Sequence, residues 1–203
     1  MQLTEVSTML TDYLLAAVTA ALALALWRRA RGRAAVAVHA IGFTALAVSA
    51  AAGGTYHGFA LVLSPGTLYV LWKVTTWTVG VFSFCIATGA AVAYTRGPAR
   101  LALVAAAGAV LIAYLAWMLA HDEFRFVIYD TAFAMLLLAA LSLYAFRAGA
   151  PGAGWLLAGI AVSAAAAGVQ YLRVALHPSF NHNDLYHVVQ AAAMYLFYRG
   201  ALG

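Results

Sequence analysis

The residues best suited to chemistry lie near the end of the chain, in the stretch NHNDLYHVVQ that begins at Asn181. Asp184, His187 and Gln190 follow one another at intervals of three residues, so they share one face if the stretch is helical. Neutral imidazole is a common zinc ligand, often beside carboxylates. The same stretch also fits a helix start, with Asn181 as the cap and Asp184 in the first turn. Both interpretations stay open for Asp184, whereas capping leaves His187 unexplained.

Other polar side chains fall at a similar depth in the apolar segments described below. With a rise of about 1.5 Å per residue, they lie about 5 to 12 Å below one membrane surface. A charged group costs on the order of 3 kcal/mol at the bilayer centre and less near the surface, so several at one depth need a common explanation. We therefore expect a shared polar cavity at this depth. Its candidate lining residues are His57, Lys73, Asp130, Gln170, Arg173, His187 and Gln190.

Some of these positions allow more than one role. His57 follows small residues that would let a metal or a substrate approach, but a lone buried histidine is often only hydrogen-bonded. Asp130 can form a structural ion pair with Lys73 or Arg173, or it can act in catalysis and orient a histidine. The charged triplet that begins at His121 lies in a polar break, and we expect it to be solvated.

The elements that must position these residues are membrane-spanning helices. The 203-residue sequence is 66% hydrophobic and 8% charged, with a mean hydropathy of +0.92, whereas soluble domains carry about 25% charged residues. Apolar runs between polar or Pro/Gly-containing breaks predict helices of the length a bilayer requires. They cover residues 10–28, 34–61, 67–95, 101–120, 125–146, 153–176 and 183–201. The sequence therefore predicts an all-α bundle of seven transmembrane helices that forms a single domain over residues 1–203.

Basic residues set the expected orientation, because they favour the cytoplasmic side of short loops. Lys73, Arg125 and Arg173 fall in one half of the predicted bundle, together with all six acidic residues. The other half holds Arg28, Arg29, Arg31, Arg33, Arg96, Arg100, Arg147 and Arg199. We therefore expect the N-terminus outside and the C-terminus in the cytoplasm, in the cytoplasmic membrane of a bacterium.

The same sequence disfavours several functional classes. Its net charge of +5 forms no basic stripe with interleaved aromatics, so we expect no nucleic-acid partner. Cys85 is the single cysteine, which leaves no intramolecular disulfide and no cysteine metal site. Lys73 is the single lysine and lies outside the last helix, which disfavours a retinal Schiff base. The acidic start is unlike a signal peptide, and the sequence indicates no protein partner.

Two short motifs and the order of the helices resemble a known family. GGTYH ends at His57 near the end of the second predicted span, and NDLYH runs from Asn183 to His187 at the start of the seventh. This layout resembles the CREST superfamily of seven-span membrane hydrolases, which includes alkaline ceramidases and the progestin and adiponectin receptors. The resemblance implies zinc held at one side of the membrane by three histidines. Here these would be His57, His187 and, from the preceding loop, His182.

Three positions depart from the pattern of that family. Gly53 stands where the family has a serine four residues before the first histidine, although Thr55 is close by. Asn183 stands where the HxxxH motif has its first histidine. The third span offers Lys73 where the family has an aspartate, so Asp130 would have to serve from another helix.

Two hypotheses follow. In the first, the protein is a zinc-dependent intramembrane hydrolase of a lipid amide or ester, with its site in the outer half of the membrane. Asp130 or Asp184 would orient or deprotonate the attacking water. Lys73 or Arg173 would meet an anionic headgroup or a developing oxyanion. The expected substrate-binding residues are Thr55, Arg173 and Gln190. In the second, a non-enzymatic seven-helix protein binds a lipid or small ligand, or senses protons, through the same polar layer.

Overall fold

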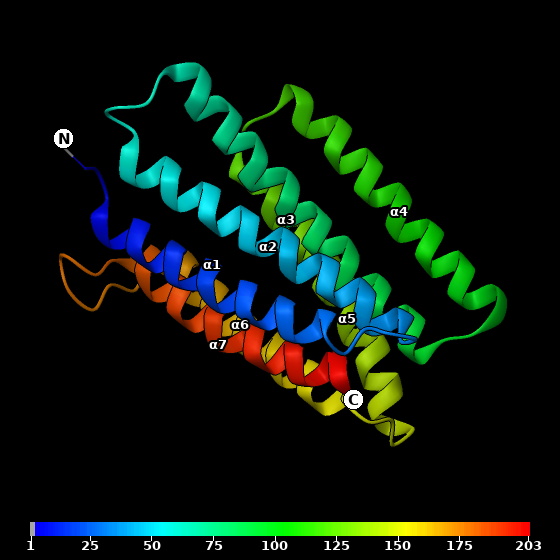
Figure 1. Cartoon of the computed structure of the whole chain (residues 1–203). Helices are drawn as coiled ribbons and strands as arrows, with labels where there is room; N and C mark the ends of the chain where they lie inside the picture. Colours follow the sequence, from blue (N-terminus) through cyan, green and yellow to red (C-terminus); the bar gives the residue numbers. More distant parts are fainter. Residues whose placement is uncertain (1–2) are drawn as a thin grey trace.

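Seven α-helices make up most of the computed structural model, which describes residues 3–203. They are α1 (Val6–Trp27), α2 (Ala34–Phe59), α3 (Pro65–Tyr94), α4 (Gly97–Ala120), α5 (Phe124–Arg147), α6 (Ala153–Tyr171) and α7 (His182–Leu202). The helices lie side by side, joined by short connections (Figure 1). The all-α prediction is confirmed. Residues 1 and 2 of the predicted domain lie outside the described residues.

The helix ends follow the local sequence and differ from the predicted ends by a few residues. Ser64 caps α3, because its hydroxyl accepts the backbone N–H of Thr67 at 3.2 Å and Pro65 occupies the first turn. The largest difference is in α6, which ends at Tyr171 rather than at the predicted residue 176. Arg173 takes a left-handed φ of 52°, which stops the helix, so this arginine lies in the connection to α7.

Six of the helices, α1 to α6, are long and apolar enough to cross a membrane. Large apolar side chains on their outward faces fit a lipid environment: Leu101 is 72% exposed, Ile112 69% and Leu136 71%. The protein is therefore a multi-pass membrane protein. α7 has 21 residues, but its first turns are polar, with Asp184 and His187 among them, and this separates it from the other six.

The helices pack around a common core. α2 packs between α1 and α3, α7 contacts α1 and α6, and α3 also contacts α4 and α5. α4 lies at the edge of the bundle (Figure 1). Large side chains from six helices, all but α4, fill the centre, and small residues let neighbouring helices approach. The fully buried ones include Leu26, Phe43, Ile86, Leu138, Leu156 and Phe197.

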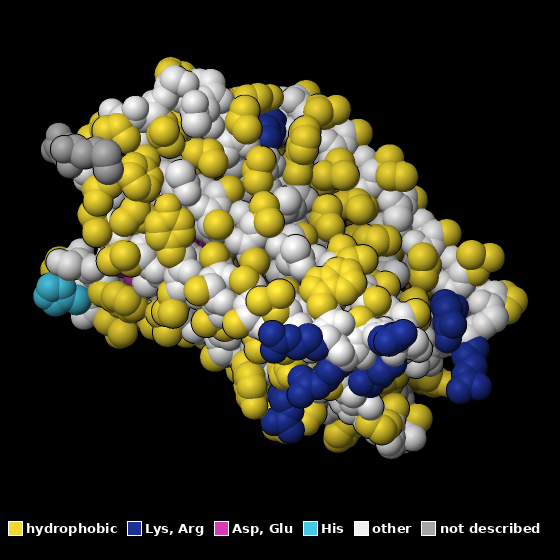
Figure 2. Space-filling view, viewed as in Figure 1, with side chains coloured by type: hydrophobic (Ala, Val, Ile, Leu, Met, Phe, Trp, Pro, Cys, Tyr) yellow, Lys and Arg dark blue, Asp and Glu magenta, His cyan; other side chains and the backbone are white. Residues whose placement is uncertain are grey.

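Charge divides the two ends of the bundle. Lysine and arginine side chains gather at one end of the face shown in Figure 2, near the C-terminus. We call this the arginine end; it holds Arg28, Arg29, Arg31, Arg33, Arg96, Arg100, Arg147 and Arg199, all at or between helix ends. The opposite end, where α1, α3, α5 and α7 begin, we call the acidic end, because Glu5, Asp122 and Glu123 lie in its connections.

Candidate functional site

At the acidic end, α7 begins with a capping box that also joins it to α1. The Asp184 carboxylate accepts the backbone N–H of Asn181 through Oδ2 (2.7 Å), and Asn181 Oδ1 accepts the backbone N–H of Asn183 (2.8 Å). The other oxygen, Oδ1, accepts the hydroxyl of Thr8 on α1 at 2.9 Å. Asp184 is fully buried. The capping interpretation is confirmed, and both carboxylate oxygens are used in holding α7 against the rest of the bundle.

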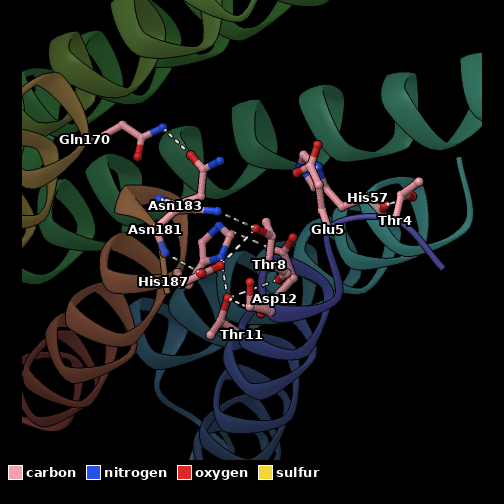
Figure 3. A network of polar contacts seen from close by, with 12 residues as sticks. Thr4, Glu5, Thr8, Thr11, Asp12, His57, Gln170, Asn181, Asn183 and His187 are labelled. Atoms are coloured by element: carbon pink, nitrogen blue, oxygen red, sulfur yellow. Dashed lines mark hydrogen bonds and ion pairs between the residues drawn. The ribbon is translucent and has the colours of Figure 1, made fainter. Parts of the chain in front are cut away.

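His187 lies one turn further along α7, between two groups of α1 (Figure 3). Its Nε2 is 3.3 Å from Asp12 Oδ1, and its Nδ1 is 3.1 Å from the hydroxyl of Thr11. The side chains of His187 and Asp12 are 13% and 8% exposed, so the pair is largely shielded from solvent. The His187 imidazole therefore connects α7 to Thr11 and Asp12, two consecutive residues of α1 that are far from it in the sequence.

Two arrangements of protons satisfy this geometry. In one, the Thr11 hydroxyl donates to Nδ1, and Nε2–H of a neutral His187 donates to Asp12. In the other, Thr11 donates to the backbone carbonyl of Ser7 or Thr8, each 3.1 Å away, and Nδ1–H donates to Thr11. The second arrangement requires an additional proton between Nε2 and Asp12, because two acceptors would otherwise face each other. The site can therefore take up a proton without any change of partner residues.

Asp12 was not among the predicted site residues. It lies against α2 at two glycines: a Cβ at Gly54 would come 2.9 Å from Asp12 Cβ, and one at Gly53 would come 3.6 Å from Asp12 Oδ2. The glycines thus let α1 approach α2 closely and leave the carboxylate over bare backbone. The signal available in the sequence was the polar spacing of Thr8, Thr11 and Asp12 within an otherwise apolar helix.

His57 lies in a separate contact at the end of α2. Its Nδ1 is 2.9 Å from Glu5 Oε2, and its carbonyl accepts the hydroxyl of Thr4. Figure 3 shows His57 beside Glu5 and Thr4, apart from the bridge made by His187. Thr55, predicted as a substrate-binding residue, instead bonds to its own helix and lies 3.0 Å from the hydroxyl of Tyr13. The residues around His57 thus fasten the segment before α1 to α2.

Lys73 and Asp130 are not partners of each other. The buried Lys73 ammonium lies 2.7 Å from Asp122 Oδ1 and donates to the carbonyls of Met118 and His121, so it closes the α3–α4 pair at the acidic end. The expected Lys73–Asp130 pair is therefore wrong, because the lysine side chain extends toward the connection after α4. Asp130 Oδ2 is buried on α5 and has no hydrogen-bond partner among residues 3–203.

The remaining predicted residues are dispersed around the end of α6. Gln190 donates to Ser163 on α6 (3.3 Å) and so points away from the Asp12 side of α7. Gln170 donates to Asn183 Oδ1 at 2.7 Å, which ties the end of α6 to the start of α7. His182 is the first residue of α7, and Arg173 is exposed in the preceding connection. Their helices thus present Gln170 and Gln190 to different neighbours.

The predicted zinc site of His57, His182 and His187 stays a prediction. Among the described residues, no three His, Cys, Asp or Glu side chains are grouped so that they could hold a metal. His57 and His187 instead use their ring nitrogens in separate contacts with Glu5 and with Asp12 and Thr11. We therefore derive no reaction step through zinc from this geometry.

Comparison with known sequences gives a family without an assigned activity. Residues 7–203 match a family described as a family of unknown function, DUF6962. No curated protein matches the chain. The matched range contains all of α7 and the α1 residues that contact it, including Thr8, Thr11 and Asp12. Because the match covers nearly the whole sequence, the chain belongs to DUF6962.

Proposed function

We propose that this is a seven-span protein of a bacterial cytoplasmic membrane that senses protons from the external side. α7 is the seventh span: its 21 residues give a length of about 32 Å, enough for the hydrocarbon core, and it packs beside α1 and α6. Its polar residues face neighbouring helices, so they need not meet lipid. The arginine end lies in the cytoplasm, as the distribution of basic residues favours.

Cysteine labelling tests this topology. Cys85 is buried, so single cysteines can be introduced in a Cys85→Ala background at the exposed positions Ser179, near the acidic end, and Arg31, at the arginine end. With intact cells, we expect a membrane-impermeant thiol reagent to label Ser179→Cys and not Arg31→Cys. Permeabilised cells should show both labelled. In intact cells, the reverse pattern would contradict the orientation, and labelling of both positions would contradict an odd number of spans between them, where α2 to α6 lie.

The contact between His187 Nε2 and Asp12 Oδ1, which we call the proton bridge, is the observation that carries the proposal. Ionisable groups inside membrane helices are rare and commonly mark proton or ion pathways. Here two buried carboxylates, Asp12 and Asp184, lie near one imidazole between α1 and α7. Two like charges in a shielded site oppose each other, so binding a proton there lowers the electrostatic free energy. Histidine is the side chain whose ordinary titration range lies closest to external pH values.

Proton binding changes the attraction between α1 and α7. With the added proton, a charged imidazole faces the Asp12 carboxylate, and this ion pair is strong because water is largely excluded. Without it, His187 is neutral and the contact is an ordinary hydrogen bond. The start of α7 is also connected to α6, because Gln170 donates to Asn183. When the attraction between α1 and α7 weakens, the start of α7 can therefore move together with the α6–α7 connection.

Distance measurements between spin labels test the proton response. With labels at the exposed residues Leu61 and Ser179 in the Cys85→Ala background, we expect a narrower distance distribution at low pH than at high pH. His187→Gln, which cannot acquire a charge, should remove the pH dependence. His121→Gln is the matched control, because His121 stacks on Trp117 (4.0 Å between ring centroids) away from α1 and α7.

Two results of the distance measurement would each be decisive. A pH response that survives in His187→Gln contradicts the proposal, and so does a response lost equally in His121→Gln.

Elemental analysis of the same preparation separates the second candidate function, zinc-dependent hydrolysis of a lipid amide or ester. That candidate rests on the CREST resemblance and on the contact between the His187 imidazole and the Asp12 carboxylate (3.3 Å), because zinc sites commonly combine these two groups. Stoichiometric zinc that is lost in His187→Gln would favour it over proton sensing.

A further inference from the structure

A second candidate site lies at the arginine end, remote from the proton bridge. A cavity of about 380 Å³ opens there between the beginning of α2, the end of α3 and the end of α7. Its size is within the range of small-molecule sites, about 300 to 1,000 Å³. Most of its walls are small apolar side chains, and three further residues, Arg33, His39 and Tyr94, have polar side chains. Among the small residues are Ala35, Ala90, Ala93, Ala150 and Gly200.

His39 lines this cavity and carries a buried hydrogen-bonding atom without a partner among the described residues. The residue is 2% exposed, and its Nδ1 lies 2.8 Å from the carbonyl oxygen of Ala35, so Nδ1–H donates there. Nε2 is then an acceptor, and it has no partner among the described residues. A Cβ at Gly89 of α3 would overlap the imidazole, so the ring lies flat against that helix and cannot turn to another partner. Buried polar atoms in folded proteins are normally paired, and a donor in the cavity would pair this one.

The opening of the cavity attracts anions. Arg33 donates through Nη2 to the carbonyl of Leu202 at 2.8 Å, which holds the guanidinium in place and leaves its other N–H groups available. α2 starts directly after this arginine without a side-chain cap, and its first-turn residues Ala34 to Val36 line the same cavity. Uncapped N–H groups at a helix start favour an anion. None of the cavity-lining residues is acidic.

We propose that this cavity binds a glycerol-phosphate group, that is, a phosphate ester with a neighbouring hydroxyl. The phosphate lies at Arg33 and the start of α2, the hydroxyl donates to His39 Nε2, and the alanine walls accommodate the carbon chain. The same chemistry is present in the headgroup of phosphatidylglycerol in the inner leaflet and in soluble glycerol phosphate. The proposal is independent of the proton bridge, because the two sites share no residue.

Nuclear magnetic resonance of ¹⁵N-labelled histidine tests the contact directly. The full chain, tagged at its N-terminus so that the cavity beside Gly203 stays open, is placed in phosphatidylcholine nanodiscs. Soluble glycerol phosphate is titrated in one arm, and phosphatidylglycerol is added to the nanodisc in the other. We expect a saturable shift of the His39 Nε2 resonance in at least one arm; the arm that responds identifies the source. Inorganic phosphate, which lacks the carbon-bound hydroxyl, should bind at least about tenfold more weakly.

Three variants make the test specific. Arg33→Gln should weaken binding about tenfold, because it removes a charge-assisted contact to the phosphate. Arg31→Gln is the matched control: it removes the same charge from the same end, but Arg31 does not line the cavity, so its affinity should stay near that of the unaltered protein. Ala93→Leu narrows the cavity without removing a polar group and should abolish binding. No shift with either probe, or equal weakening in Arg31→Gln and Arg33→Gln, would overturn the proposal.

Discussion

Replacing Asp184 with alanine is expected to lower the free energy of unfolding by about 3 kcal/mol, with loss of contact between α1 and α7. The carboxylate makes two buried contacts, one with the backbone N–H of Asn181 and one with the hydroxyl of Thr8. Alanine leaves both donors unpaired and removes the cap of α7. Unfolding of the purified protein in mixed micelles with increasing sodium dodecyl sulfate measures the difference.

Two substitutions separate this effect from a general sensitivity to lost acidic residues. Asp184→Asn keeps one acceptor oxygen in place, so it should retain part of the cap and be less destabilising than alanine. Glu123→Ala removes an exposed acid at the same end of the bundle, and it should leave unfolding unchanged. Within residues 3–203, Glu123 forms an ion pair only with the exposed Arg125. If Asp184→Ala unfolds at the same detergent fraction as Glu123→Ala, the capping box does not hold α7.

Much of the helical architecture could be predicted from the sequence because apolar runs and turn residues are local signals. The third predicted helix, residues 67–95, starts within two residues of α3, since the Ser64 cap and the helix-initiating Pro65 act on their own neighbours. The end of α6 was placed too late for a corresponding reason. Arg173 takes a left-handed conformation, although arginine has no intrinsic preference for it. The residue type therefore does not predict the end of the helix.

The candidate site was predicted only in part, because the level of a residue along its helix axis is easier to predict than the neighbour that its side chain faces. Residue counting placed Lys73, Asp130, His187 and Gln190 near one level, which position along each helix determines. Which neighbour each faces depends on how the helices are rotated and packed. Lys73 extends to Asp122 beyond its own helix, and Gln190 faces α6 instead of α1.

Asp12 shows why a partner that is distant in the sequence is difficult to predict. It is a single acid near the start of the first apolar run, and nothing in its neighbouring residues indicates a partner. Its role depends on His187, a residue 175 positions later in the chain, and on the bare backbone of Gly53 and Gly54 beside it. Long-range pairing of this kind leaves no local pattern. The part of the site that was predicted, Asp184 with His187, is the part that lies within one turn of a single helix.

Substituting Gly159 with alanine is expected to destabilise the protein by about 2 kcal/mol and to separate α6 from α7. A Cβ at this position would lie 2.6 Å from Phe197 Cδ1 and 2.7 Å from Cε1. The Phe197 ring is fully buried in the core, so it cannot move aside without displacing other side chains. Unfolding in mixed micelles should therefore occur at a lower detergent fraction.

Gly168→Ala is the matched control in the same helix. A Cβ there would have no atom within 4 Å, so the substitution adds no clash and gains the higher helix propensity of alanine, up to about 1 kcal/mol. The two glycine variants should thus move stability in opposite directions although the chemical change is identical. Because α7 carries the proton bridge and borders the cavity at the arginine end, Gly159→Ala should also weaken both responses, whereas Gly168→Ala should preserve them. Equal behaviour of the two variants would mean that α6 does not position α7.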